Sequence, residues 1–129
     1  EPTPDRLIEE ALALGYVAPH TETDCIDCVI AKLVGISLAT QPNRACYIPV
    51  GHVSADLYSD APRQMPMGVV LDKLKALHED PAVLKIGHNF KYDWVMFEKA
   101  GIEVAPVPHS DLKLMHSWSN CDLTRSVRL

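Results

Sequence analysis

The sequence contains no long apolar run and no excess of positive charge, and each absence excludes a class of protein. No apolar segment approaches the roughly 20 residues that a membrane-spanning helix needs, so we expect no membrane association. The chain starts Glu1-Pro2, without the basic start and apolar core of a secretory signal. The 129 residues carry a formal net charge of -5, so bulk charge alone does not hold nucleic acid here. A local site that works through metal ions is compatible with this composition.

Cysteine is also scarce, which argues against a disulfide framework. The four cysteines are Cys25, Cys28, Cys46 and Cys121. We expect them to be reduced thiols in a cytoplasmic protein. The spacing of Cys25 and Cys28 is that of half a zinc site, which His20, Cys46 and His52 could complete. No second pair with this spacing follows, so two small loop residues are the simpler interpretation.

The order of secondary-structure elements predicts a mixed α/β fold in a single domain, residues 1–129. Apolar patterns and turn residues predict five strands, at residues 16–21, 33–39, 45–50, 83–87 and 102–104. Helices are predicted at residues 4–14, from Met67 to the Asp80-Pro81 stop, at 90–100 after an Asn89 cap, and at 112–118. Three consecutive strands followed by alternating helices and strands favour a mixed sheet of about five strands flanked by helices.

Acidic residues lie at two points where elements begin or end. Alternation along the first strand would place His20, Glu22 and Asp24 on one face. Asp93 falls in the first turn of a helix, where the helix dipole favours an anion. Hard divalent ions prefer carboxylate oxygens, and many nucleases hold two such ions. We expect Glu22 and Asp93 to meet in space, although a solvated surface acid is the ordinary alternative for each.

Two segments resemble the exonuclease motifs of the proofreading domain of bacterial DNA polymerase I. Residues 21–27, Thr-Glu-Thr-Asp-Cys-Ile-Asp, resemble the first motif, Asp-Thr-Glu-Thr-Asp-Ser-Leu-Asp. Residues 87–93, Gly-His-Asn-Phe-Lys-Tyr-Asp, resemble the second, Gly-Gln-Asn-Leu-Lys-Tyr-Asp. The resemblance runs from about residue 3 to residue 115.

The resemblance implies a ribonuclease H-like fold and removal of nucleotides from the 3' end of single-stranded DNA. It implies two-metal phosphodiester hydrolysis with Mg²⁺ or Mn²⁺, in which Glu22 and Asp93 are catalytic residues and metal ligands. The positions that match the lining of the terminal nucleotide are Thr23, Ile26, Asn89 and Tyr92. A polymerase domain in a longer parent protein would be a natural partner.

The sequence also departs from the family pattern. His20 stands where the first motif has an aspartate, and a neutral imidazole is a poor magnesium ligand. The third motif, Tyr-x-x-x-Asp on a late helix, does not occur before Leu129. We therefore expect an impaired exonuclease domain, with a catalytically defective scaffold or weak nucleic-acid-binding domain as the alternative. The missing helix would also leave an apolar face exposed, which favours self-association.

Overall fold

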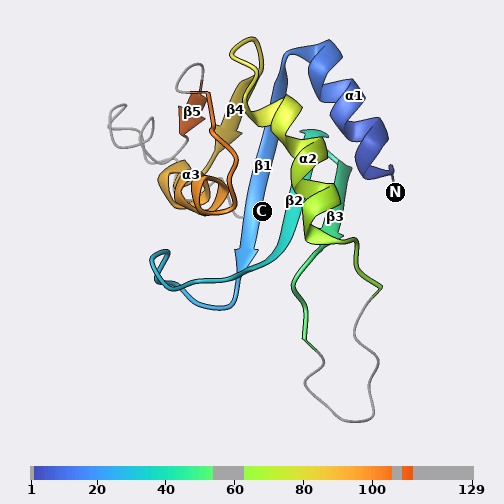
Figure 1. Cartoon of the computed structure of the whole chain (residues 1–129). Helices are drawn as coiled ribbons and strands as arrows, with labels where there is room; N and C mark the ends of the chain where they lie inside the picture. The colour runs from blue at the N-terminus through green and yellow to red at the C-terminus, as the bar shows by residue number, and fades with distance from the viewer. Residues whose placement is uncertain (1, 54–62, 106–108, 112–129) are drawn as a thin grey trace.

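A computed structural model describes residues 2–53, 63–105 and 109–111, which form a mixed α/β fold (Figure 1). The helices are α1 (Pro4–Leu14), α2 (Met67–His78) and α3 (Phe90–Lys99). The strands are β1 (Tyr16–Thr23), β2 (Leu33–Gln41), β3 (Arg44–Pro49), β4 (Leu84–Gly87) and β5 (His109–Asp111). No helix among these residues is both long and apolar enough to cross a membrane.

The strands form one sheet in the order β3-β2-β1-β4-β5. The β1–β2 and β2–β3 pairs are antiparallel, whereas β1–β4 and β4–β5 are parallel. Parallel neighbours need a crossover connection, and α3 lies in the connection between β4 and β5. This order makes β1 the central strand, with β2 on one side of it and β4 on the other.

The first helix begins and ends at the residues that the sequence predicts. The Thr3 hydroxyl accepts a hydrogen bond from the Arg6 N–H at 3.4 Å, and proline occupies the first turn. Gly15 follows the helix with a φ of 78°, a left-handed conformation that favours glycine. The chain therefore turns directly from α1 into β1.

A charged cluster fastens this helix to the β2–β3 hairpin. The guanidinium of Arg44 donates from Nε to both Glu10 carboxylate oxygens at 2.7 Å, and the Thr40 hydroxyl donates to Glu10 Oε1 at 2.7 Å. These hydrogen bonds, Arg44 first, lower the pKa of Glu10 to about 2. The carboxylate thus keeps its charge throughout the neutral and mildly acid range.

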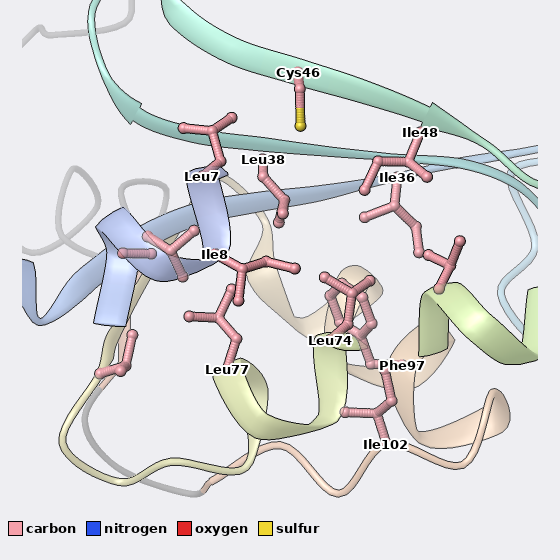
Figure 2. Close-up of a cluster of buried hydrophobic side chains, with 14 of the residues drawn as sticks. Leu7, Ile8, Ile36, Leu38, Cys46, Ile48, Leu74, Leu77, Phe97 and Ile102 are labelled. Atoms are coloured by element: carbon pink, nitrogen blue, oxygen red, sulfur yellow. The ribbon is translucent and has the colours of Figure 1, made fainter. Parts of the chain in front are cut away.

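The hydrophobic core lies between one face of the sheet and the three helices (Figure 2). The strands contribute Val17, Ile36, Leu38, Cys46 and Ile48, and the helices contribute Leu7, Ile8, Leu74, Leu77 and Phe97. Each large apolar side chain buried in this way contributes about 1.5–3 kcal/mol to folding. The opposite face carries smaller or polar side chains, and His20, Ser37 and Tyr47 lie in one row across β1, β2 and β3.

Four of the five predicted strands appear where the sequence places them, and the fifth does not. The segment from Ile102 to Val104 is not a strand, although Ile102 and Val104 are buried. Its backbone N–H groups donate to α3 and to the end of α2: Ile102 to the Phe97 carbonyl, Glu103 to the Glu79 carboxylate. The fifth strand is β5, which pairs with β4. The apolar pattern indicated burial correctly but not the hydrogen-bond partner.

The predicted Asn89 cap of α3 is only partly correct. Asn89 does precede α3, but its side chain does not cap the helix, because the residue has a φ of 59° and a left-handed backbone. The predicted helix at residues 112–118 lies outside the described residues.

Among the described residues, strongly exposed large hydrophobic side chains gather in the loop after β1, at Ile26, Val29 and Ile30. Self-association stays a prediction.

The last residue of α2, His78, is a buried histidine. His78 is 0% exposed, and its ring lies 4.2 Å from that of Phe97 between centroids. Its Nδ1 lies 2.9 Å from the Leu74 carbonyl oxygen, which a neutral ring satisfies by donating from that nitrogen. Its Nε2 is buried without a hydrogen-bond partner. Burial lowers the pKa of His78 from 6.5 to about 4.

We expect His78 to make the fold less stable in mild acid. Below pH 6.5 the unfolded chain takes up a proton at His78 that the folded chain refuses until pH falls to about 4. Between about pH 7 and about pH 4.5 this difference removes about 2–3 kcal/mol of unfolding free energy. Urea unfolding of the wild type and of His78→Phe, which keeps an aromatic ring but cannot titrate, measures the effect. Equal losses of stability in both proteins would contradict the assignment.

Candidate active site

On the β4 side, none of the described strands lies beside the second part of β1. The β1–β4 pairing covers only Tyr16 and Val17, and the first turn of α3 lies next to the rest of β1 (Figure 1). The turn from β4 into α3 is tight, because a Cβ on Gly87 would lie 2.7 Å from the Phe90 ring. Glycine at this position therefore lets α3 start close against the end of the sheet.

The carboxylate of Asp93 lies against this part of β1. Its Oδ1 accepts hydrogen bonds from the Thr21 backbone N–H at 2.8 Å and from the Thr21 hydroxyl at 2.6 Å. Asp93 is 1% exposed and Thr21 is 3% exposed. Because a buried backbone donor without a partner is costly, this pair of bonds holds α3 against β1.

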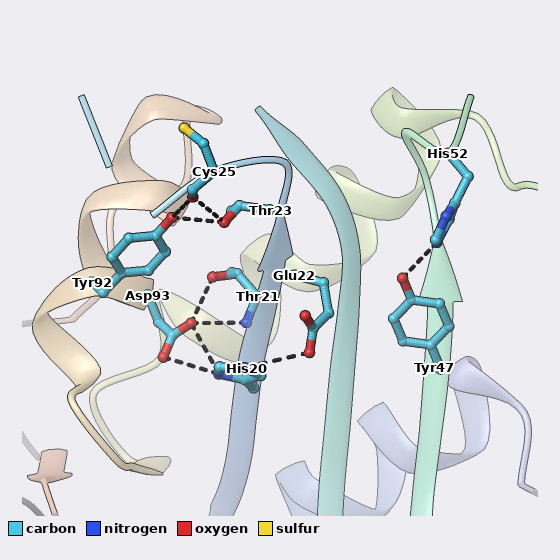
Figure 3. A network of polar contacts seen from close by, with 9 residues as sticks. All are labelled: His20, Thr21, Glu22, Thr23, Cys25, Tyr47, His52, Tyr92 and Asp93. Atoms are coloured by element: carbon cyan, nitrogen blue, oxygen red, sulfur yellow. Dashed lines mark hydrogen bonds and ion pairs between the residues drawn. The ribbon is translucent and has the colours of Figure 1, made fainter. Parts of the chain in front are cut away.

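The neighbouring residue in α3 holds the end of β1 as well. The Tyr92 hydroxyl donates to the Cys25 carbonyl at 2.8 Å and lies 2.6 Å from the Thr23 hydroxyl. The Thr23 hydroxyl also lies 2.9 Å from the Cys25 carbonyl. Consecutive residues of one helical turn thus fasten both the last part of β1 and the start of the following loop (Figure 3).

His20 lies between the two acidic residues that the sequence analysis selected. Its Nε2 is 3.5 Å from Glu22 Oε1, and its Nδ1 is 3.3 Å from Asp93 Oδ1 (Figure 3). The side chains of His20 and Glu22 are 56% and 55% exposed, whereas that of Asp93 is 2% exposed. The structure therefore places Glu22 and Asp93 on the same imidazole ring, and their role as a catalytic pair stays a prediction.

The two ring nitrogens of His20 face different carboxylates. Carboxylates only accept hydrogen bonds, and an imidazole nitrogen that carries a proton donates. The ring thus presents one nitrogen to each acid. Within the described residues, no group of three His, Cys, Asp or Glu side chains is arranged to hold a metal ion.

Asp24 does not join the cluster, which corrects the expectation that it shares a face with His20 and Glu22. β1 ends at Thr23, and Asp24 lies beyond it. Its Oδ1 accepts a hydrogen bond from the Lys32 N–H at 2.7 Å. The carboxylate closes the base of the loop instead of pointing into the site.

The zinc interpretation is not supported among the described residues. Cys46 is 4% exposed within the core, on the side of the sheet that faces the helices. The His52 Nε2 lies 2.6 Å from the Tyr47 hydroxyl. These two candidate ligands are therefore engaged elsewhere and do not complete a site with Cys25 and Cys28.

Tyr47 is a neighbour of the cluster that the sequence analysis did not select. Gly35 pairs with Glu22 across β1 and β2, and a Cβ at Gly35 would collide with the Tyr47 hydroxyl. Glycine therefore lets the Tyr47 ring lie over β2 toward Glu22. Partial burial, and next the charge of Glu22, raise the pKa of Tyr47. The available signal was strand register, because His20, Ser37 and Tyr47 are successive partners.

The remaining predicted substrate residues surround the same end of β1. Thr23 and Tyr92 are in direct contact. Ile26 is 93% exposed in the loop, and Asn89 directly precedes α3. Their roles toward a nucleotide stay predictions.

Comparison with known proteins identifies the family of this chain. A family model described as 3'-5' exonuclease matches residues 1–127. This chain belongs to that exonuclease family. It is 43% identical over 114 residues to DNA polymerase I of Rhizobium leguminosarum, which covers 78% of this chain and 11% of that protein. It is 34% identical over 115 residues to DNA polymerase I of Chloroflexus aurantiacus, covering 81% of this chain and 12% of that protein.

Solved structures show the same fold. A structure titled as the apo form of a nuclease superposes with a TM-score of 0.62 at 22% identity, covering 94% of this chain and 56% of that chain. Escherichia coli RNase D gives a TM-score of 0.52 at 18% identity, covering 97% of this chain and 34% of the other. Brucella melitensis NrnC with bound Mg²⁺ gives 0.57 at 20% identity, covering 84% and 47%. These likenesses show the fold that the resemblance predicted, and the family match supports an exonuclease-like function. The chain spans about a tenth of the length of its polymerase relatives.

The two acids should differ sharply in their effect on stability. Asp93→Ala leaves the N–H and hydroxyl of Thr21 without their buried acceptor, so we expect a loss of about 2–3 kcal/mol of unfolding free energy. Glu22→Ala is the matched control, and its half-exposed carboxylate should change stability by less than about 0.5 kcal/mol. Urea unfolding monitored by circular dichroism measures both. Equal effects of the two substitutions would show that the Thr21 bonds do not hold α3 in place.

Proposed function

We propose that this exonuclease-family domain acts on the 3' end of single-stranded DNA, and that on its own it turns over weakly or not at all. The observation that carries the second part is the His20 ring between Glu22 and Asp93, at 3.5 Å and 3.3 Å from their oxygens. Each acid already has an internal partner at the place where the family resemblance would have it meet a metal ion.

The donor set does not suit a pair of magnesium ions. Two divalent ions carry four positive charges, whereas Glu22 and Asp93 return only two negative ones. Asp93 Oδ1 already accepts two hydrogen bonds from Thr21, and His20 adds no negative charge. Neutral imidazole is a ligand for softer ions than magnesium. Divalent metal use, Mg²⁺ or Mn²⁺, is therefore an expectation from the family that this chain meets poorly by itself.

The segment that follows β1 supports the proposed contact with the substrate. Tyr92 and Thr23 fix the Cys25 carbonyl, and Ile26 extends from this anchored segment with 93% of its surface exposed. A fixed backbone that presents an exposed apolar side chain is suited to packing against a base. By resemblance, Asn89 completes the set of residues that would contact the terminal nucleotide.

A binding domain without catalysis is the second candidate function. The position of His20 favours it, because the ring lies between the two acids where the resemblance would have a metal ion. The polymerase relatives are about ten times longer than the matched segment, so a polymerase domain of a longer parent protein is the natural partner. Such a domain would hold a 3' end or act as a scaffold.

Turnover separates these two candidates. With a 5'-labelled single-stranded oligonucleotide and Mg²⁺ or Mn²⁺, we expect cleavage slower than that of a complete proofreading domain by a factor of about 10² or more. His20→Asp should strengthen metal binding, measured by calorimetry, and raise turnover without restoring it fully. Robust Mg²⁺-dependent digestion by the wild type, abolished by Glu22→Ala, would show that catalysis is intact.

Binding is tested independently of turnover by fluorescence anisotropy without added metal. We expect a labelled single strand with a free 3' end to bind, and Ile26→Ala to weaken its binding by about 3- to 10-fold. Val53→Ala is a matched control, because Val53 is 90% exposed and lies outside the β1 loop. Equal effects of the two substitutions, or no binding by the wild type, would remove the proposed substrate contact.

A further inference from the structure

The loop between β1 and β2 is held in one conformation by its own ends and by α3. At its base the Asp24 N–H donates to the Lys32 carbonyl at 3.2 Å, and the Lys32 N–H returns a bond to the Asp24 carboxylate. The Lys99 ammonium donates to the carbonyls of three loop residues, Cys28, Val29 and Ala31, at 2.8–3.0 Å. A loop with an exposed apolar tip therefore has an ordered backbone.

Two thiols lie within this loop. Cys25 and Cys28 are both free and half-buried, so reagents of small size reach them. The Cys25 sulfur lies 3.6 Å from the Asp27 carbonyl oxygen. That carbonyl belongs to the peptide group that joins Asp27 to Cys28. The first sulfur thus already lies against the peptide group that leads into the second cysteine.

We propose that Cys25 and Cys28 form a reversible dithiol–disulfide pair beside the active site. The co-reactant is a low-molecular-weight disulfide of the oxidised glutathione class. One cysteine thiolate attacks it, forms a mixed disulfide and releases one small thiol. The second cysteine attacks the mixed disulfide, closes the Cys25–Cys28 bond and releases the second small thiol. The two cysteines lose two electrons and two protons, and the small disulfide gains them.

The pair is placed to change the candidate substrate contact. Ile26 lies between the two cysteines in the chain, and the Cys25 carbonyl is the acceptor for Tyr92 and Thr23. Closing the ring constrains the backbone torsions on both sides of Ile26. For a chain expected in a reducing compartment, a labile pair of this kind is regulatory and not structural. The thiol chemistry itself does not depend on the proposed exonuclease function.

The chain supplies its own controls for the experiment. Trypsin cleaves after Arg6 and Lys32, so Cys25 and Cys28 fall in one peptide, residues 7–32. Cys46 and Cys121 fall in two other peptides, residues 45–63 and 114–125. An internal disulfide makes peptide 7–32 lighter by two hydrogens, whereas any other pairing joins two peptides. Cys46 is 4% exposed and reports whether oxidation occurs only through unfolding.

The full chain is equilibrated in glutathione mixtures, and exchange is stopped with acid. The free thiols are then alkylated, and the protein is digested and examined by mass spectrometry. We expect at least about half of peptide 7–32 to carry the internal disulfide in mixtures that leave the Cys46 peptide alkylated, with reversal by dithiothreitol. Cys25→Ser and Cys28→Ser should each abolish the two-hydrogen loss, and Cys46→Ser should retain it. Circular dichroism confirms that each variant is folded.

Three outcomes would overturn the proposal. Peptide 7–32 could remain fully alkylated, carry only stable glutathione adducts, or be found joined to another cysteine peptide. None of these outcomes depends on nuclease activity, so failure of the redox proposal is distinguishable from failure of the proposed function. If the disulfide forms, the anisotropy titration repeated on oxidised and reduced protein measures its effect on binding at a 3' end.

Discussion

The hydrogen bonds between Asp93 and Thr21 are the interaction on which the rest of the site depends. β1 is the central strand, but β4 pairs with only its first residues. Asp93 supplies an acceptor to Thr21, which lies beyond the β1 residues that pair with β4, and it holds α3 against β1. A buried carboxylate is tolerated only when its oxygens are hydrogen-bonded, and here two donors of one residue meet that requirement. Tyr92, next to Asp93 in α3, can then reach the loop after β1.

The same residue links structure and chemistry. Asp93 accepts two hydrogen bonds from Thr21 of β1, and His20 Nδ1 lies 3.3 Å from its Oδ1. The other ring nitrogen of His20 lies 3.5 Å from Glu22 Oε1. The fold and the site place separate demands on the chain. The bonds between Asp93 and Thr21 meet the first of these demands.

Several elements could be predicted from the sequence because their causes are local. Thr3, Pro4 and Gly15 determine where α1 begins and ends, and alternation and turn residues identify four strands. The strand at Ile102–Val104 was wrong for a physical reason. Its apolar residues are buried as the pattern indicated, but their backbone donors bond to residues of α3 and of the end of α2. The prediction that Asn89 caps α3 was also wrong. Asn89 has a left-handed backbone conformation, and its side chain makes no capping hydrogen bond.

By itself, the sequence determined the fold class, the order of most elements and the two acids of the candidate site. Helix caps, strand alternation and motifs each depend on residues that are close together in the chain. Only the tertiary structure decided how those acids are used. Asp93 and Thr21 are 72 positions apart, and Asp93 and His20 are 73 apart, so their contacts follow from how far β4 extends along β1. The same holds for Tyr47, whose ring lies over Gly35 toward Glu22 only once three strands are in register. Chain neighbours set the local conformation, whereas the topology of the sheet determines which charges meet.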